Sequence, residues 1–320
     1  MAVDEPGREV ERAHDRTARS GRRGFGRFVG VGAVVLALAV LVGHGVGGEE
    51  RGAPSLGRTS QEQAPPEDPH RGPSSGLGAE FTGEGVLRHN PLYTTGRLAP
   101  LPCPAPGLDV HDTASMKRFL DTVADCLDHA WATQFAKAGL EFEPPGRVFW
   151  TEPGSSPCRD YPSAAGGFYC RASKSVYIGL SDVVEKWRHS PDSVVYASLL
   201  AHEYGHHVQG EAGILDYYHE QRRLESDPVE RSFWTRRSEL QANCLAGAFL
   251  GAVSVTYPLG DAEHRVLLED AAATADREGS SDAERTHGSA QNSALWLERG
   301  LDYQTPGSCN TWAAEEDLLQ

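Results

Sequence analysis

The sequence lacks the surplus of basic residues that a nucleic-acid-binding protein needs. Its 320 residues hold 30 Lys and Arg against 45 Asp and Glu, a net charge of −15. Binding to nucleic acid depends on clustered Lys and Arg that release counterions from phosphates. Residues 1–27 hold seven Arg and five acidic residues, so residues 28–320 carry a net charge of −17. We therefore exclude nucleic acid as a partner and assign the acidic character to the main body of the chain.

Asp, Glu, Lys and Arg are absent from residues 28–48. At ~1.5 Å per residue a helix of this length spans roughly 30 Å, enough to cross a bilayer. Arginines precede it and acidic residues follow it, so the positive-inside rule keeps the N-terminus in the cytoplasm. We predict a cytoplasmic basic tail (1–27), a single membrane anchor (28–48) and an extracytoplasmic remainder. A signal-peptidase site at residues 37–39 and a twin-arginine signal at residues 22–25 remain alternatives.

Apolar residues are scarce between residues 49 and 85, which are rich in Pro, Gly, Ser, Gln and Glu. Such a composition cannot offset the entropy lost on ordering, so we expect a disordered linker. Aromatic and apolar residues return near Asn90-Pro91-Leu92-Tyr93. The folded domain is therefore expected to occupy residues 86–320.

No Cys-x-x-Cys pair occurs, which argues against a cysteine-rich metal site. An even number of cysteines on the exported side is typical of disulfides in an oxidising compartment. Fifteen pairings into three bridges are possible, and the most local one joins Cys158 to Cys170. The six cysteines are Cys103, Cys126, Cys158, Cys170, Cys244 and Cys309.

Hydrophobic periodicity predicts an α+β fold. Apolar residues recur at three- and four-residue steps from Met116 to Phe135, which indicates a helix over residues 112–138 that ends at Gly139. Aromatic and β-branched runs predict three strands of a small antiparallel sheet, at residues 147–150, 167–170 and 176–180. Further helices are expected over residues 192–209, 228–252, 261–276 and 289–299.

The segment His202-Glu203-Tyr204-Gly205-His206 has the spacing H-E-x-x-H on one of these helices. Residues four apart lie above one another on a helix, so both imidazoles can reach one zinc ion. Glu203 is one position from His202 and can lie beside the metal's water without binding the metal. A general base belongs there, because zinc lowers the pKa of that water from ~15.7 to about 7.

The third ligand decides the class of site. A metzincin would have Gly at position 209 and His at position 212, but this chain has Gln209 and Ala212. Glu239, on the next long helix, can complete a set of two His and one Glu. Small residues follow it, which indicates a helix packed closely against a neighbour. Asn243 lies one turn further on, where its amide could accept a hydrogen bond from a ligand imidazole.

Taken in order, these motifs resemble the neutral zinc metallopeptidases of bacteria, and in particular the membrane-anchored actinobacterial type. The resemblance spans roughly residues 90–312. It implies a zincin-like, gluzincin-like domain with one zinc ion on His202, His206 and Glu239 and with Glu203 as catalyst. The motifs are residues 90–93, 201–209, 238–242, 286–289 and 309–311.

Asn243 departs from the family, which usually has an Asp there, so we expect weaker zinc binding or a slower enzyme. For the cysteines we predict the pairs Cys103–Cys126, Cys158–Cys170 and Cys244–Cys309, the last following the resemblance.

Several other residues have weaker claims to a role. His287 could stabilise the oxyanion of a tetrahedral intermediate, or it could cap a helix or lie on the surface. Tyr217 and Tyr218 could serve the same role, although aromatic packing suits them better. His207 is expected to make structural hydrogen bonds, and His219 is a remote candidate for a spare ligand. The strand near residues 175–180 could be an edge where a peptide docks, with plain sheet packing as the default.

These observations predict a zinc-dependent peptidase, specifically an endopeptidase, that acts on peptide or protein substrates. Two alternatives stay open: a non-catalytic zinc-containing binding module at the cell surface, and a zinc hydrolase that cleaves a cell-wall amide. The intact Glu203 argues against the first, because a structural zinc site has no use for a general base.

Overall fold

The computed structural model describes residues 82–162 and 166–320. The predicted tail, the predicted anchor and residues 49–81 of the predicted linker lie outside this part of the chain. Within it, no helix is both long enough and apolar enough to span a bilayer. Its α-helices are α1 (Gly85–Arg88), α2 (Thr113–Ala138), α3 (Leu180–Lys186), α4 (Ser193–Glu211), α5 (Ile214–Leu224), α6 (Pro228–Val253), α7 (Asp261–Ala273) and α8 (Ala290–Tyr303).

Helix α2 forms as its sequence predicts. The Asp112 side chain caps it by accepting a hydrogen bond from the backbone N–H of Ala114, at 2.9 Å. Gly139 ends it in the left-handed conformation, at a φ of 69°, which glycine adopts without steric cost. The predicted apolar stripe from Met116 to Phe135 is buried. This stripe packs onto α4 and forms one wall of the core.

The sheet is mixed, which corrects the prediction of an antiparallel one. Strand β5 (Ser175–Gly179) lies in the middle, antiparallel to β4 (Gly167–Cys170) and parallel to β1 (Gly146–Trp150). Composition identifies strands but not the direction in which they pair. Parallel pairing needs a long connection, and residues 151–174 supply it. That connection also holds the short hairpin of β2 (Gly154–Ser155) and β3 (Asp160–Tyr161).

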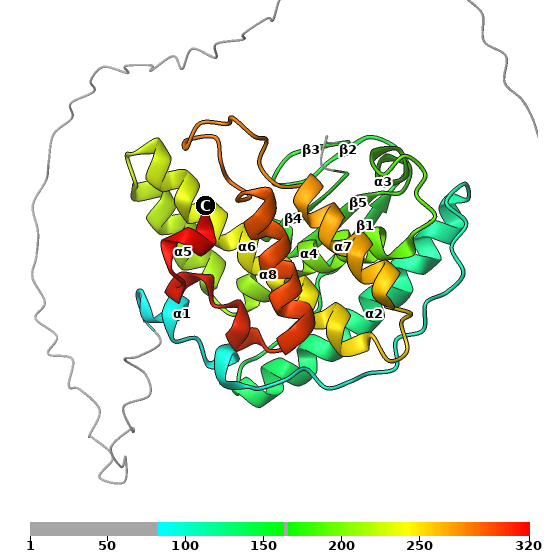
Figure 1. The fold of residues 1–320 in the computed structure, drawn as a ribbon, viewed down its shortest axis with the longest axis horizontal. Helices are drawn as coiled ribbons and strands as arrows, with labels where there is room; N and C mark the ends of the chain where they lie inside the picture. Colours follow the sequence, from blue (N-terminus) through cyan, green and yellow to red (C-terminus); the bar gives the residue numbers. More distant parts are fainter. Residues whose placement is uncertain (1–81, 163–165) are drawn as a thin grey trace, which may run out of the picture. The chain divides into compact units, whose positions relative to one another are not determined.

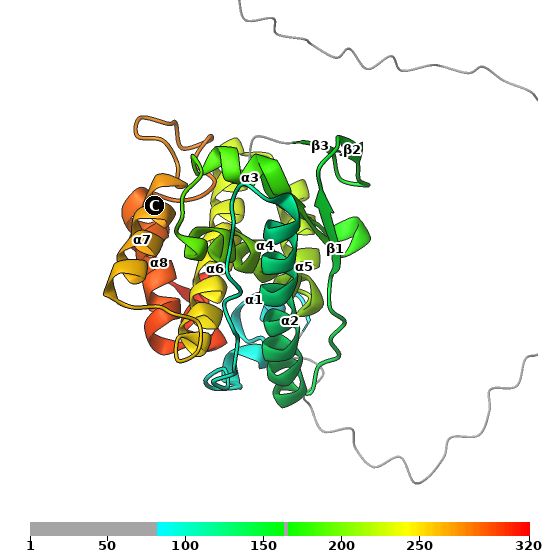
Figure 2. The same ribbon diagram turned by 90° about the vertical axis from the view of Figure 1, so that its right-hand side faces the viewer.

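Helix α4 lies in the centre of the domain. Helix α6 packs on one side of it, and α2 and the strands β4 and β5 pack on the other (Figures 1 and 2). Helix α8 covers the far side of α6, where Gly300 brings the two helices together. A Cβ on Gly300 would lie 2.1 Å from the carbonyl oxygen of Cys244. The central position of α4 means that its central residues face other elements rather than bulk solvent.

Three disulfide bonds staple the domain, and the predicted pairing is confirmed. They join Cys103 to Cys126, Cys158 to Cys170, and Cys244 to Cys309. No free cysteine occurs in the part of the chain that the structure describes.

The helices α1, α3 and α5 were not predicted from the sequence. Helix α5 follows α4 after a break at Gly213, whose φ is +75°. Its buried residues are only Ile214, Leu215 and Tyr218, too few for a clear helical period. The other long helices lie within a few residues of their predicted ranges. The α+β class is confirmed.

Candidate metal centre and active-site cleft

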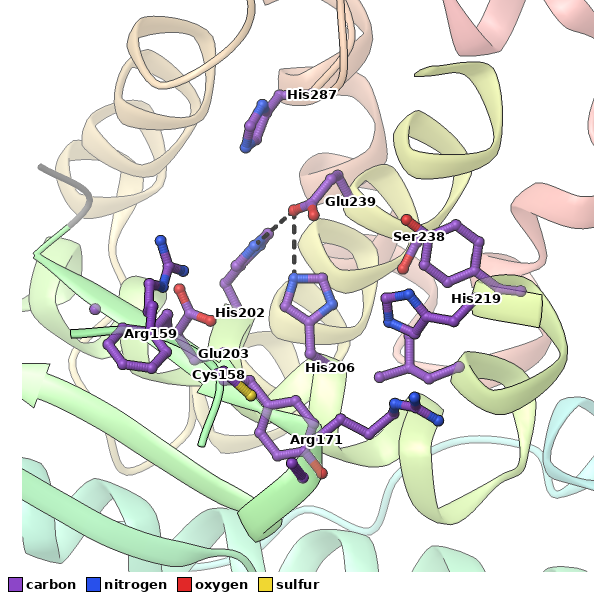
Figure 3. Close-up of a pocket in the computed structure, with 16 residues that line it drawn as sticks. Cys158, Arg159, Arg171, His202, Glu203, His206, His219, Ser238, Glu239 and His287 are labelled. Carbon is purple, nitrogen blue, oxygen red and sulfur yellow. Dashed lines mark ion pairs between the residues drawn. The ribbon is translucent and has the colours of Figure 1, made fainter. Parts of the chain in front are cut away.

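Helices α4 and α6 bring His202, His206 and Glu239 together. The Nε2 atoms of both histidines lie 3.3 Å from Oε2 of Glu239, as the dashed lines in Figure 3 mark. Candidate ligand atoms from all three residues lie within 4.8 Å of one another. The side chains are partly buried, so a small ion could still reach them.

The geometry of this cluster fits zinc. A tetrahedral zinc ion with ligand distances of about 2.0–2.1 Å holds its ligand atoms about 3.3–3.4 Å apart. The two Nε2–Oε2 separations of 3.3 Å match this value. Two imidazoles and one carboxylate, with a fourth position left for water, form the ligand set of a catalytic rather than a structural site. The residues present therefore fit the metal that the sequence predicts.

Asn243 lies where the sequence predicted. Its amide oxygen is 2.7 Å from Nδ1 of His202, and its amide nitrogen donates to the hydroxyl of Ser293 at 3.0 Å. Because the amide oxygen can only accept, Nδ1 of His202 carries the proton and Nε2 is left with a free lone pair. The imidazole is therefore oriented with its metal-binding atom toward Glu239.

His206 is oriented by a contact that the sequence did not reveal. Its Nδ1 lies 2.9 Å from the amide oxygen of Gln209. The amide nitrogen of Gln209 donates to the amide oxygen of Gln241, at 3.0 Å, and both glutamines are fully buried. In the sequence, Gln209 served to exclude a metzincin and formed the last residue of the motif at residues 201–209, without a role of its own. A glutamine three positions after the second histidine was its one visible signal.

The indole of Trp312 fixes this chain of amides. Its N–H can only donate, and it lies 3.1 Å from the amide oxygen of Gln241. The amide nitrogen of Gln241 must then point the other way, to Tyr93 Oη at 2.8 Å and to the carbonyl of Cys309 at 3.0 Å. Gln209 must in turn present its oxygen to His206. The Gln209 amide nitrogen also donates to the backbone carbonyl of Ser238, at 2.8 Å. The indole of Trp312 and this carbonyl together determine which nitrogen of His206 is free for the metal.

Glu203 lies beside the metal cluster without joining it. It is absent from the set of converging ligand atoms, although it follows His202 directly. Its mostly buried side chain lines a cleft of about 510 Å³ together with His202, His206 and Glu239. Among the described residues, no side chain forms a hydrogen bond or ion pair with its carboxylate. A water in this cleft could therefore reach a free carboxylate and the metal position together.

Opposite charges stabilise the cluster. Burial lowers the pKa of His206, but the nearby Glu239 carboxylate outweighs burial and raises that pKa to about 9. Burial likewise raises the pKa of Glu239, but the two imidazoles outweigh it and hold that pKa well below its usual range. A divalent cation can replace the proton on the imidazole, since zinc binds neutral histidine and ionised carboxylate.

His287 lies across the cleft from the metal cluster, as Figure 3 shows. The Asp276 carboxylate holds its loop by accepting hydrogen bonds from the backbone N–H groups of Thr286, His287 and Gly288, at 2.8–3.0 Å. The imidazole itself is about half exposed. It does not cap helix α8, because Ser289 does so. The sequence did not single out Asp276, which lies ten positions before the loop it holds.

The remaining candidates have other partners. His207 is buried, and its ring nitrogens contact the carbonyl of Glu143 and the hydroxyl of Tyr169, so it is structural as expected. Tyr218 is buried and donates to Thr235 at 3.1 Å. Tyr217 only packs against the core.

His219 lines the cleft but does not belong to the metal cluster. Partial burial, with Arg171 and Arg222 nearby, lowers its pKa to about 4.

Two histidines and a glutamate on packed helices, beside a free glutamate in an open cleft, define a zinc-dependent hydrolase. Comparison with known families agrees. Residues 105–312 match the family described as "putative neutral zinc metallopeptidase", and the chain belongs to this family. Membership in this family supports a zinc-dependent peptidase as the general class of the protein.

Relatives by sequence include two proteins described as uncharacterized. YpfJ of Escherichia coli strain K12 is 29% identical over 205 residues, which cover 61% of this chain and 71% of the relative. Rv2575 of Mycobacterium tuberculosis strain H37Rv is 29% identical over 259 residues, which cover 72% of this chain and 83% of the relative. No solved structure matched the chain.

Proposed function

We propose that this protein is a zinc-dependent endopeptidase that holds one zinc ion on His202, His206 and Glu239. The observation that carries the proposal is the separation of roles in the cleft: three converging ligand atoms, with the Glu203 carboxylate beside them but outside the set. A purely structural zinc site uses four protein ligands and has no free carboxylate next to it. This arrangement therefore favours catalysis over a binding module.

When bound, zinc lowers the pKa of a water molecule to about 7 and polarises a carbonyl group. Glu203 accepts the proton of the attacking water and then delivers it to the leaving amine, a role worth about 10²–10⁴ in rate. Asn243 and Gln209 keep the two imidazoles in the tautomer that leaves Nε2 free. His287, across the cleft, would donate a hydrogen bond to the oxyanion of the tetrahedral intermediate.

The peptide substrate would lie along strand β4. The sequence suggested the strand at residues 175–180 as a docking edge, but β5 is paired on both sides. Strand β4 is an outer strand of the sheet, and Gly167, Phe168 and Tyr169 line the cleft. An extended peptide could add to this edge through backbone hydrogen bonds.

We also propose the location that the sequence predicts. Residues 28–48 would anchor the chain in the cell membrane as a single span, with the N-terminus in the cytoplasm and residues 86–320 on the extracytoplasmic side. The three disulfide bonds support this, because such bonds persist in oxidising compartments.

The test is metal analysis combined with cleavage of a mixed peptide library. We expect about one zinc per chain, cleavage that a chelator abolishes and zinc restores, and loss of most zinc in His202→Ala, His206→Ala and Glu239→Ala. His129→Ala is the matched control, because His129 is an exposed histidine on α2. Full zinc retention by Glu239→Ala would contradict the ligand set.

A further inference from the structure

One wall of the cleft carries a charged side chain to which the proposed chemistry gives no role. Strand β4 forms part of it, and the segment before β4 contributes Cys158 and Arg159. Figure 3 shows Arg159 on the same side of the cleft as Glu203. Arg159 is thus close to the position where the bond to be cleaved would lie.

Two contacts hold Arg159 at this place. The neighbouring Cys158 is bonded to Cys170, which is the last residue of β4. The guanidinium carbon of Arg159 lies 4.3 Å from the centre of the Phe168 ring, also on β4. Such stacking leaves the edge of the guanidinium, which bears its N–H donors, free to bind. The side chain is exposed, so a ligand in the cleft can reach it.

Within residues 82–162 and 166–320, the charge of Arg159 has no acidic partner. Among the described residues, no carboxylate lies within 4.0 Å of its guanidinium. Arg171 lines the same cleft at the other end of β4, but it forms an ion pair with Asp216. Arginine binds carboxylates through two parallel N–H···O hydrogen bonds.

We propose that Arg159 binds a carboxylate of the peptide substrate and so favours peptides with an acidic group close to the bond that is cleaved. The group could be an Asp or Glu side chain or a free C-terminal carboxylate, which present the same chemistry. This inference rests on the proposed peptidase function and names a substrate class for it.

Binding to the zinc-loaded, full-length Glu203→Gln chain tests the proposal without turnover. The probes are fluorescent hexapeptides with amidated C-termini, in which one Glu is moved through all six positions and replaced by Gln as reference. A second pair differs only in a free or amidated C-terminus. At one or two positions we expect Glu to tighten binding about three- to tenfold, as for a charge-assisted, partly exposed pair. The second pair shows whether a terminal carboxylate serves equally.

Further substitutions in the Glu203→Gln chain show which residue causes the preference for Glu. Arg159→Gln should remove the preference for Glu, and Arg159→Glu should reverse it in favour of Lys at the same position. Arg171→Gln is the matched control and should leave the preference in place, because Asp216 already neutralises Arg171. The reversal by Arg159→Glu also shows that the variant is folded.

Three results would overturn the inference. Equal binding of Glu and Gln peptides by the parent chain would refute it while leaving the peptidase proposal intact. The preference for Glu could also be the same at all six positions, or it could be abolished by Arg171→Gln and not by Arg159→Gln. Either result would show that the overall electrostatic potential of the cleft, and not Arg159, causes the preference. Failure of every peptide to bind would refute the peptidase proposal and this inference with it.

Discussion

At the scale of single residues, the metal centre depends on the hydrogen-bond partner of Nδ1, the nitrogen of each ligand histidine that does not face the metal. Both Nδ1 atoms face neutral amide oxygens, from Asn243 at 2.7 Å and from Gln209 at 2.9 Å. An amide oxygen fixes the tautomer, but it is a weaker hydrogen-bond acceptor than a carboxylate and polarises the imidazole N–H less. The imidazoles are therefore weaker donors to zinc than a neighbouring carboxylate would make them.

Asn243→Asp should tighten zinc binding. A carboxylate at this position polarises the His202 imidazole, and the Ser293 hydroxyl can turn from accepting to donating its hydrogen bond. Changes to a residue that hydrogen-bonds a metal ligand alter metal affinity or activity by about 10–100-fold. Competition with a chelator measures the affinity, and Asn243→Leu should change it in the opposite direction. Equal affinities in all three proteins would show that this contact does not tune the metal.

Trp312→Phe should disturb His206, although the two residues do not touch. Without the indole N–H, the Gln241 oxygen loses a donor, and only the carbonyls of Ser238 and Cys309 hold the two amides in place. Nδ1 of His206 then has a less firmly fixed acceptor. We expect zinc affinity to fall by up to about tenfold. Nitrogen NMR of the metal-free protein, recorded at a pH above the His206 pKa of about 9 so that the imidazole is neutral, should report a mixture of His206 tautomers. Trp234→Phe is the control, because its ring packs against Trp312 but forms no hydrogen bond to the amides. A single Nδ1–H tautomer in both variants would contradict the account.

The sequence reveals most clearly the site residues that lie close together in the chain. H-E-x-x-H places two ligands and a base within five positions of one helix, so their convergence follows from helix geometry. Glu239 stood out from the other polar residues on its helix because small residues follow it, and Asn243 because it lies one turn further on; the family resemblance then supported both. Asp276 could not be found, because its partners are backbone N–H groups of a loop that any sequence could supply. Gln209 and Trp312 meet only through Gln241, which links distant parts of the chain.

At the scale of elements, the site depends on how closely α4, α6 and α8 approach. A Cβ on Gly205, which lies between the ligands of α4, would be 3.0 Å from the carbonyl oxygen of Ala242 on α6. On the other face of α6, Gly247 admits the backbone of α8, and Gly300 on α8 admits the backbone of α6. Glycine sets the distance between the histidines and Glu239, because larger residues would push α4 and α6 apart.

Gly300→Ala should destabilise the fold strongly. The new methyl group would overlap the backbone of α6, which cannot rotate aside as a side chain could, so we expect a cost of at least about 3 kcal/mol, at the upper end for overpacked cores. Chemical denaturation measures this free energy of unfolding. Gly107→Ala is the control, because nothing lies within 4 Å of its Cβ position. Equal stabilities of the two variants would show that α6 and α8 can separate without penalty.

Elements with a strong period could be predicted, whereas pairing and short helices could not. Helix α2 buries one continuous stripe and has both of its caps in the sequence. Helix α5 buries three residues, and α3 has only seven residues in all. Strand β1 has the right composition, but its parallel pairing depends on the path of residues 151–174. Patterns inside an element are visible in the sequence, and contacts between elements are not.

At the scale of the whole molecule, the two ends of the described chain converge on the helix that carries Glu239. Tyr93 and the carbonyl of Cys309 both accept hydrogen bonds from Gln241. The bond from Cys244 to Cys309, 65 positions apart, fixes the C-terminal segment to α6. The disulfide and the buried amides thus support the same part of the metal centre.

Cys244→Ser with Cys309→Ser should therefore weaken both the fold and the metal site. In the chain-entropy model, a bridge closing a loop of this length contributes about 4 kcal/mol. We expect the free energy of unfolding to fall by about 2–4 kcal/mol and zinc affinity to fall with it. Cys158→Ser with Cys170→Ser is the comparison, because it opens the β4 wall of the cleft without touching α6. Equal zinc affinity in both double variants and in the parent would show that the Cys244–Cys309 disulfide does not support the metal site.

The central claim is that this protein uses zinc rather than merely holding it, and Glu203→Gln tests it most directly. The change keeps the size of the side chain and removes the base. Zinc content, thermal unfolding and peptide cleavage should be measured on the same preparations of wild type and variant. We predict equal zinc content and unfolding temperature, with cleavage reduced by at least about 10²–10⁴. Undiminished cleavage at equal zinc content, or a wild type that cleaves nothing in a broad peptide library, would contradict the account.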